Sequence, residues 1–123
     1  MRWKPIALGL SIAASSLAAA QEPGDWVLSR WRGSTQYFPG VVQSRHGDVV
    51  NVRFDDGTVS QVPVSQIRPY DWRVGTAVEC RWTDGRWYAA VITAMGDDAV
   101  SLDVLYEDGD RQHTATGNCR STQ

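Results

Sequence analysis

Val52-Arg53-Phe54-Asp55-Asp56-Gly57 returns in the second half of the chain as Val104-Leu105-Tyr106-Glu107-Asp108-Gly109. Each stretch has the pattern of a β-strand that ends in an aromatic residue, and two acids and a glycine follow. An Asp-Gly pair after such a strand predicts a hairpin, because the tight turn requires a positive φ angle. The two stretches therefore predict β-hairpins at equivalent places of a repeated fold.

The repetition extends well beyond this phrase. Three further segments of the first copy have equivalents in the second at a nearly constant offset: 24–31 with 75–82, 37–42 with 87–92, and 66–68 with 118–120. A fixed period of this length indicates two copies of one structural unit.

Each copy has the pattern of an all-β unit. Val27, Ser29 and Trp31 alternate with Leu28 and Arg30, which is the period of a half-buried strand. Further strands are predicted at 38–43, 49–54 and 58–62, then at 77–82, 87–95, 99–106 and 110–115, with turns at 46–48 and 96–98 and a closing turn at 63–67. Short strands at regular spacing favour small barrels, and no amphipathic helix is predicted after residue 20.

Residues 1–20 have the layout of a secretory signal peptide. Arg2 and Lys4 form a basic start, residues 6–17 are apolar or small, and Ala18-Ala19-Ala20 is a small-residue cleavage site. The apolar stretch is shorter than the roughly 20 residues that span a bilayer, which favours a signal peptide over a membrane anchor. We expect export to the periplasm or the medium, with no stable membrane span after cleavage.

The charge of the predicted mature chain argues against nucleic acid as a partner. Without Arg2 and Lys4 the chain has 10 basic and 14 acidic residues, a formal net charge of −4. Binding to a phosphate backbone depends on neutralisation by Lys and Arg, which a mildly acidic domain supplies poorly.

Cys80 and Cys119 are the two cysteines of the chain. In an exported protein such a pair predicts a disulfide, and the cysteines and histidines do not have the spacing of a metal site. Cys80 lies on the first strand of its copy and Cys119 at the end, and these segments are neighbours in a closed five-stranded barrel. The closed loop is expected to stabilise the second copy by about 4 kcal/mol. The first copy has Ser29 and Ile67 instead, and is predicted to be the less stable half.

The predicted organisation has four parts: a signal peptide at 1–20, a first barrel at 21–69, a linker at 70–73 and a second barrel at 74–123. The linker has no Gly/Ser tract, so it is not flexible. Each half is small for an independent core, and mutual packing is therefore expected. Tyr70 and Trp72 are predicted to lie in the contact between the halves.

The chain resembles a tandem Tudor protein, from the family of small SH3-like barrels found in chromatin readers. The first copy contains Val27-x-x-x-Trp31, Tyr37-Phe38-x-Gly40-Val41-Val42 and Val52-x-Phe54-Asp55-Asp56-Gly57, and the second keeps the frame in Trp82, Trp87-Tyr88 and 106–109. The resemblance covers nearly all of the predicted mature chain. It implies an all-β fold of two tandem SH3-like, Tudor-type barrels packed against each other.

The resemblance also implies two aromatic cages for methylated lysine or arginine, where the first–second and third–fourth strand connections meet. By position the cages would be Trp31, Phe38, Phe54 and Asp56 in the first copy, and Trp82, Tyr88, Tyr106 and Asp108 in the second. Ring faces attract a methylammonium group and a carboxylate completes the charge match, with an expected affinity of about millimolar to high micromolar. Where a further cage aromatic often follows, this chain has Thr58 and Asp110, and Phe38 stands where many cages have tyrosine. Both cages are therefore incomplete, and the second, with the added acid Asp110, is the better candidate.

The same residues also have a purely structural interpretation, in which the rings line the barrels and Asp56 and Asp108 form turns. The predicted function is an exported, non-enzymatic module that binds a cationic or methylated group or peptide, without a cofactor. The alternative is a structural or adaptor module that contacts a protein or envelope polymer and has no such pocket. Convergence of Trp82, Tyr88 and Tyr106 on one open pocket, with an acid at its rim, would favour the cage.

Enzymatic motifs are absent from the sequence: it has no Gly-x-Ser-x-Gly and no phosphate-binding glycine loop. His113 could pair with Asp108 or Asp110 as an acid–base group, although a solvated histidine is the simpler interpretation. Asp55-Asp56 and Asp97-Asp98 are better explained as hairpin turns than as calcium ligands. The sequence leaves the ligand and the oligomeric state open.

Overall fold

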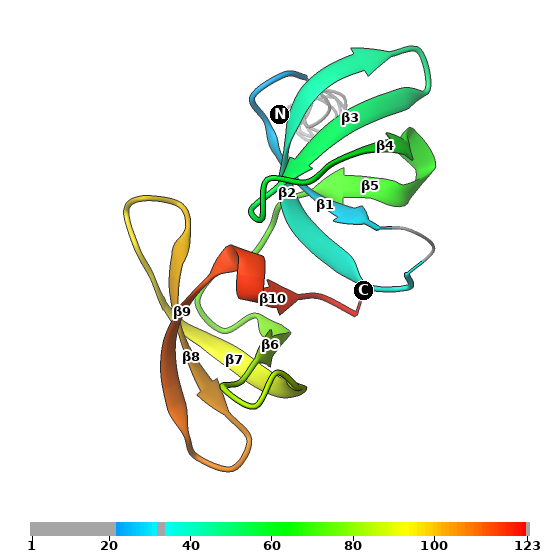
Figure 1. Cartoon of the computed structure of the whole chain (residues 1–123). Coiled ribbons are helices and arrows are strands. Elements are labelled where there is room, and N and C mark those ends of the chain that lie inside the picture. Colours follow the sequence, from blue (N-terminus) through cyan, green and yellow to red (C-terminus); the bar gives the residue numbers. More distant parts are fainter. Residues whose placement is uncertain (1–21, 32–33, 123) are drawn as a thin grey trace, which may run out of the picture.

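The protein is described by a computed structural model, which covers residues 22–31 and 34–122. The predicted signal peptide lies outside the described residues. The chain forms two five-stranded antiparallel sheets, each curled into a small barrel, and the two barrels lie against each other (Figure 1). The all-β, tandem architecture predicted from the sequence is therefore confirmed.

The strands of the first repeat have the order β4-β3-β2-β1-β5. They are β1 (Trp26–Arg30), β2 (Tyr37–His46), β3 (Val49–Phe54), β4 (Val59–Pro63) and β5 (Ile67–Pro69), with a 3₁₀ turn, η1 (Val64–Gln66), before β5. The segment predicted as a closing turn thus continues into a fifth strand, β5, which pairs with β1.

The strands of the second repeat have the equivalent order β9-β8-β7-β6-β10. They are β6 (Ala77–Arg81), β7 (Trp87–Met95), β8 (Ser101–Tyr106), β9 (Arg111–Ala115) and β10 (Cys119–Arg120), with η2 (Thr116–Asn118) before β10. The long strands β2 and β7 shift register at equivalent places, after Val42 and after Ile92. Such a bulge bends the strand and lets the small sheet curl.

Strand β1 is buried on both faces, which the sequence did not indicate. Val27 packs into the core of the first repeat, whereas Leu28 packs into the core of the second, and both side chains are fully buried. The prediction of a half-buried strand is wrong here because the second repeat covers the other face of β1.

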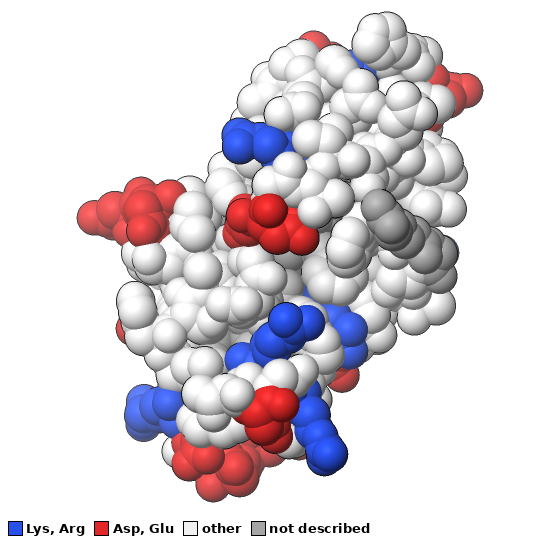
Figure 2. All heavy atoms as spheres, viewed as in Figure 1, with Lys and Arg blue, Asp and Glu red and all other residues white. Residues whose placement is uncertain are grey.

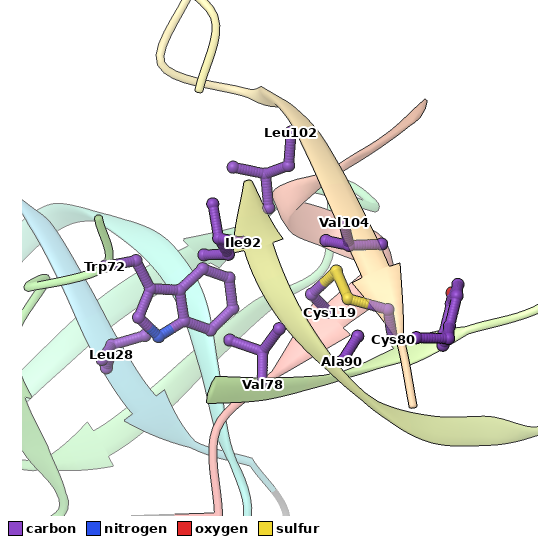
Figure 3. Close-up of a cluster of buried hydrophobic side chains, with 10 residues drawn as sticks. Leu28, Trp72, Val78, Cys80, Ala90, Ile92, Leu102, Val104 and Cys119 are labelled. Carbon is purple, nitrogen blue, oxygen red and sulfur yellow. A yellow bond between two sulfur atoms is a disulfide. The ribbon is translucent and has the colours of Figure 1, made fainter. Parts of the chain in front are cut away.

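The core of the second repeat therefore includes residues from outside it (Figure 3). Trp72 of the linker lies between Leu28 and the side chains of Val78 and Ile92, and only 5% of its surface is exposed. Tyr70 packs against Trp72 with ring centroids 5.6 Å apart. Both aromatic residues lie in the contact between the repeats, as the sequence predicted.

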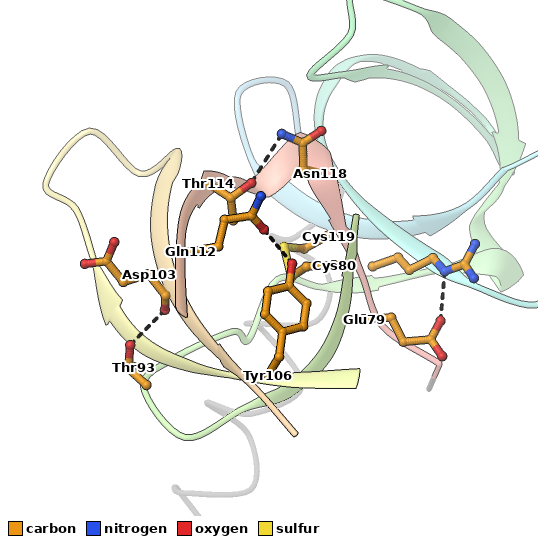
Figure 4. Close-up of a disulfide and its surroundings, with 10 residues drawn as sticks. Glu79, Cys80, Thr93, Asp103, Tyr106, Gln112, Thr114, Asn118 and Cys119 are labelled. Carbon is orange, nitrogen blue, oxygen red and sulfur yellow. Dashed lines mark hydrogen bonds and ion pairs between the residues drawn. A yellow bond between two sulfur atoms is a disulfide. The ribbon is translucent and has the colours of Figure 1, made fainter. Parts of the chain in front are cut away.

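The last strand connects the two sheets. Cys119 and Arg120 pair with Cys80 and Glu79 of β6, and Cys80 and Cys119 form a disulfide with an S–S distance of 2.09 Å (Figure 4). One residue later the chain leaves the second sheet and pairs with the first. Ser121 and Tyr37 exchange two backbone hydrogen bonds of 2.7 and 2.8 Å. The disulfide therefore anchors a segment that also holds the first repeat.

A second contact between the repeats involves η2 and the turn after β3. The Thr116 hydroxyl donates a hydrogen bond to the Asp55 carboxylate. At Gly117 a Cβ atom would lie 2.7 Å from the Cβ of Asp55, so only glycine permits this approach without a shift. Among the described residues, no helix has the length and apolar character needed to cross a membrane.

Candidate binding pockets

The larger cavity of interest lies entirely within the second repeat, and we call it the second-repeat pocket. Its volume is about 360 Å³. It is lined by all four residues of the predicted second cage together with four others: Trp82, Tyr88, Tyr106 and Asp108, then Asp84, Ala89, Glu107 and Asp110. Three aromatic side chains from two hairpins, Trp82, Tyr88 and Tyr106, thus converge on one space.

Two tight hairpins bring these rings together. The first closes at Trp82, whose N–H donates to the Arg86 carbonyl at 2.9 Å, with Gly85 at a positive φ of 83°. The second closes at Tyr106, whose N–H donates to the Asp110 carbonyl at 2.8 Å. Each aromatic residue therefore lies at the base of a turn. The two turns are adjacent, which brings the Trp82 and Tyr106 rings into contact.

The rings form walls at nearly right angles to one another. The Trp82 and Tyr106 rings are 5.3 Å apart at an interplanar angle of 82°, and Tyr88 and Tyr106 are 6.5 Å apart at 85°. Tyr106 is almost buried, its hydroxyl donates to Gln112 Oε1, and burial raises its pKa (Figure 4). Tyr88 is 40% exposed. The pocket therefore has an inner ring fixed by the core and an outer ring accessible from solvent.

Asp84 is a lining residue that sequence reasoning missed. The Tyr88 hydroxyl donates to Asp84 Oδ2 at 2.6 Å, and the Arg86 N–H donates to Asp84 Oδ1 at 2.9 Å. These two bonds, the first above all, stabilise the carboxylate and lower the pKa of Asp84, and the same bond raises the pKa of Tyr88. Asp84 lies in the connection after the first strand of the second repeat, where the Tudor resemblance locates half of the cage. That position is the signal in the sequence that could have identified it.

Acids dominate the charge around this pocket. Four of its lining residues carry carboxylates, and no lysine or arginine is among them: Asp84, Glu107, Asp108 and Asp110. Acidic side chains gather at the lower tip of the molecule in Figure 2, where Figure 1 places the turn between β8 and β9. A cation would enter this pocket with favourable electrostatics, whereas an anion would be repelled.

The second cavity holds the predicted first cage, and we call it the junction pocket because both repeats line it. Its volume is about 210 Å³. The first repeat contributes Trp31, Phe38, Pro39, Phe54, Asp55 and Asp56, and the second contributes Arg81, Trp87, Thr116, Gly117 and Asn118.

The predicted aromatic residues of the first cage do meet. The Trp31 ring lies 6.0 Å from Phe38 and 5.9 Å from Phe54, and the Trp31 indole N–H donates to the Ser60 hydroxyl at 3.1 Å. Asp56 Oδ1 accepts the N–H of Thr58 at 2.9 Å, which lowers the pKa of Asp56.

A fourth ring comes from the second repeat. Trp87 lies 6.1 Å from Phe38 in an edge-to-face arrangement. Arg81 and Arg120 lie over its ring, with guanidinium carbons 5.1 and 4.2 Å from the centroid. No pattern in the first repeat could have indicated these residues, because they reach the pocket only when the repeats dock.

The structural interpretation of the cage residues also holds in part. Phe54 and Tyr106 are buried core residues, and the Asp108 carboxylate accepts the N–H of Asp110 at 3.0 Å, as a turn-forming residue does. Both roles are compatible, because a ring can pack on the core with one edge and line a pocket with the other.

The remaining alternatives from the sequence find different partners. His113 Nδ1 lies 2.6 Å from Asp103 Oδ1 on the exposed surface of the sheet, so it does not pair with Asp108 or Asp110 as the acid–base hypothesis required. In the part of the chain that the structure describes, no group of three or more His, Cys, Asp or Glu side chains is arranged to hold a metal ion.

Comparison with known proteins supports the fold. A family profile described as "DNA repair protein Crb2 Tudor domain" matches residues 24–69, within the first repeat. The "Crystal structure of Crb2 tandem tudor domains" is similar with a TM-score of 0.54 and 16% identity, over 78% of this chain and 76% of that chain. No curated protein matches the chain significantly.

A more distant solved structure, "Crystal structure of ADCP1 tandem Agenet domain 3-4", is similar with a TM-score of 0.38 and 17% identity, over 91% of this chain and 87% of that chain. The fold of this chain is similar to that of the Crb2 tandem Tudor domains. The arrangement of this chain is thus that of tandem Tudor-like domains, as the sequence resemblance predicted.

Proposed function

We propose that this chain is a non-enzymatic binding module, and that its second-repeat pocket binds a methylated ammonium group or a similar cation. The partner is a peptide, a protein or a small cationic ligand. The observation that carries the proposal is the convergence of Trp82, Tyr88 and Tyr106 on one pocket whose charged lining residues are all acids. This arrangement of rings and acids is the one expected, from the sequence, to favour a cage over an adaptor surface.

The chemistry of the pocket suits a methylated cation better than a bare ammonium. Ring faces attract the diffuse positive charge of a methylammonium group, and each contact is worth about 0.5–2 kcal/mol depending on how far it is desolvated. A bare ammonium is more strongly hydrated and loses more on leaving water. Because Tyr88 and the acids are solvent-exposed, the expected dissociation constant is about millimolar to high micromolar.

Export is part of the same proposal. The Cys80–Cys119 disulfide supports it, because such bonds persist in oxidising compartments outside the cytosol. An exported module does not meet nucleosomes, so the partner would be a methylated surface protein, a choline-like group or an arginine-rich peptide. We likewise propose the boundaries at 20, 69 and 73, since strands β1–β5 end at Pro69 and β6 begins at Ala77.

The direct test is a titration of the mature chain with a trimethyl-lysine peptide and with its unmethylated form. Amide and indole chemical shifts should saturate, and we expect the methylated peptide to bind at least about fivefold more tightly. Tyr88→Ala, which removes an exposed wall and the hydrogen bond to Asp84, should weaken binding about five- to tenfold.

The matched control is Val91→Ala. Val91 lies on the same strand as Tyr88 and is similarly exposed at 41%, but it does not line the pocket. This variant should bind like the wild type. No saturable shift up to tens of millimolar would contradict the proposal and leave the adaptor function. Equal binding by the Tyr88→Ala variant would also contradict it.

A further inference from the structure

The two pockets differ in the charged groups that line them, because only the junction pocket combines acids with an arginine. The second-repeat pocket is lined by four acids and no base, whereas the junction pocket has Asp55, Asp56 and one arginine, Arg81. The two repeats therefore present different chemistry around a similar set of rings.

Asp55 is engaged in holding the repeats together. It accepts the hydrogen bond of Thr116, and the backbone at Gly117 packs against its side chain. Asp56 is exposed, and its Oδ1 forms the turn with Thr58. Asp56 is thus the acid that faces a ligand from the first repeat.

Arg81 is available to an anion. Its guanidinium carbon lies over the Trp87 ring, 5.1 Å from the centroid, and a guanidinium held over an aromatic face can still direct N–H groups to a carboxylate or phosphate. Arg81 is exposed and makes no ion pair with any described residue. Arg120, the other arginine over Trp87, is bound to Glu79 at 3.0 Å.

Trp87 connects the cationic and anionic ends of the pocket. Its ring meets Phe38 of the first cage at 6.1 Å and Arg81 at 5.1 Å. An aromatic surface thus continues from the rings of the first repeat to a guanidinium of the second. A ligand with a methylated ammonium at one end and an anion a few bonds away matches this sequence of groups.

We propose that the junction pocket is a separate binding site for small zwitterions that combine a quaternary ammonium with a carboxylate or phosphate. The ammonium lies among Trp31, Phe38 and Phe54 near Asp56, and the anion pairs with Arg81 across Trp87. The site exists only in the docked pair of repeats, because each repeat supplies one end of it. It does not depend on the function proposed for the second-repeat pocket.

The test compares glycine betaine with choline, which has the same trimethylammonium group but no carboxylate. Binding to the mature chain is followed by calorimetry and by the indole N–H signal of Trp87. We expect glycine betaine to bind about tenfold more tightly than choline. Phosphocholine is the third ligand. Tighter binding of phosphocholine than of glycine betaine would identify a lipid-type headgroup as the natural ligand, and the reverse order would identify a free amino-acid betaine.

Arg81→Met should remove the preference for glycine betaine and leave choline binding unchanged. Arg86→Met is the matched control, because Arg86 is an exposed arginine in the turn that follows β6 and lines neither pocket, and this variant should keep the preference. Both side chains lie on the surface, so both variants should fold.

Three results would overturn the inference: equal affinity for glycine betaine and choline in the wild type, an unchanged preference in the Arg81→Met variant, or loss of glycine betaine binding in the Tyr88→Ala variant. The last result would place the ligand in the second-repeat pocket. Failure of the trimethyl-lysine titration, in contrast, would leave the junction site unaffected.

Discussion

The two repeats pair equivalent positions between their first and last strands, but only one of the two pairs is covalent. Ser29 faces Ile67 across β1 and β5, and Cys80 faces Cys119 across β6 and β10. All four side chains are buried. The same register thus carries a non-covalent pair in the first repeat and a disulfide in the second, so only one copy of the duplicated unit has the covalent link.

The two pockets also differ in which repeats supply their lining residues. The second-repeat pocket is built from its own repeat, whereas the junction pocket needs Trp87 and η2 of the other. The first repeat therefore depends on the second for its pocket, whereas the second repeat depends on Leu28 of the first for part of its core. The lower intrinsic stability of the first repeat stays a prediction, and four experiments test the comparison between the repeats.

The largest effect is expected from Cys80→Ala/Cys119→Ala. Loss of a crosslink between residues 39 positions apart should lower the free energy of unfolding by about 4 kcal/mol, because the unfolded chain regains entropy. The measurement is guanidinium unfolding, with the wild type under reductant as the control. An unchanged midpoint in both samples would show that the disulfide does not stabilise the second repeat.

Leu28→Ala should separate the repeats. Leu28 belongs to β1 but is buried in the core of the second repeat, and its truncation should cost about 3 kcal/mol. Leu102→Ala is the matched control, since Leu102 is equally buried but lies within the second repeat. Both should destabilise the protein, and only Leu28→Ala should weaken the proton contacts between Phe38 and Trp87 in nuclear Overhauser spectra. Equal loss of these contacts in the two variants would contradict the assignment.

Gly117→Ala should displace η2 from the first repeat. The new Cβ would meet the Cβ of Asp55 at 2.7 Å, so the structure must shift at a cost of about 1–3 kcal/mol. Amide hydrogen exchange should increase at Tyr37 and Ser121, while the second-repeat pocket keeps its ligand. Asn118→Ala, at the exposed neighbouring position, is the control and should leave exchange unchanged.

The smallest effect is expected from Tyr88→Phe. Removal of the hydroxyl deletes the main hydrogen bond that lowers the pKa of Asp84, so this pKa should rise towards its ordinary value. A carboxyl with a lowered pKa stays charged as the pH falls, so the wild-type pocket should keep its Asp84 charge at lower pH than the variant. Carbon-detected titration of the carboxyl measures this, with Asp56 as the internal control because its pKa is lowered by Thr58 instead.

The sequence predicted most features that recur within one repeat, although it did not identify Asp84 or the strand β5. The aromatic residues Phe54 and Tyr106 with their acidic turns, the strand positions and the pairing of Cys80 with Cys119 followed from alternation, turn chemistry and the duplicated frame. These signals are local, or they repeat at a fixed offset, and they can therefore be read without knowing how the repeats are oriented.

The sequence did not predict the features that arise between the repeats. Leu28 looks like the outward residue of a half-buried strand, and only the docked second repeat makes it a core residue. Trp87 and Arg81 look like members of the second repeat alone, yet they line the pocket of the first.

The sequence by itself thus determined two Tudor-like barrels, their turns, their disulfide and two sets of rings, because strand period and turn chemistry depend on neighbours along the chain. Only the tertiary structure decided that one set of rings forms a self-contained acidic pocket and the other a shared pocket with an arginine. That outcome depends on how two surfaces pack, and packing between distant segments has no period in the sequence.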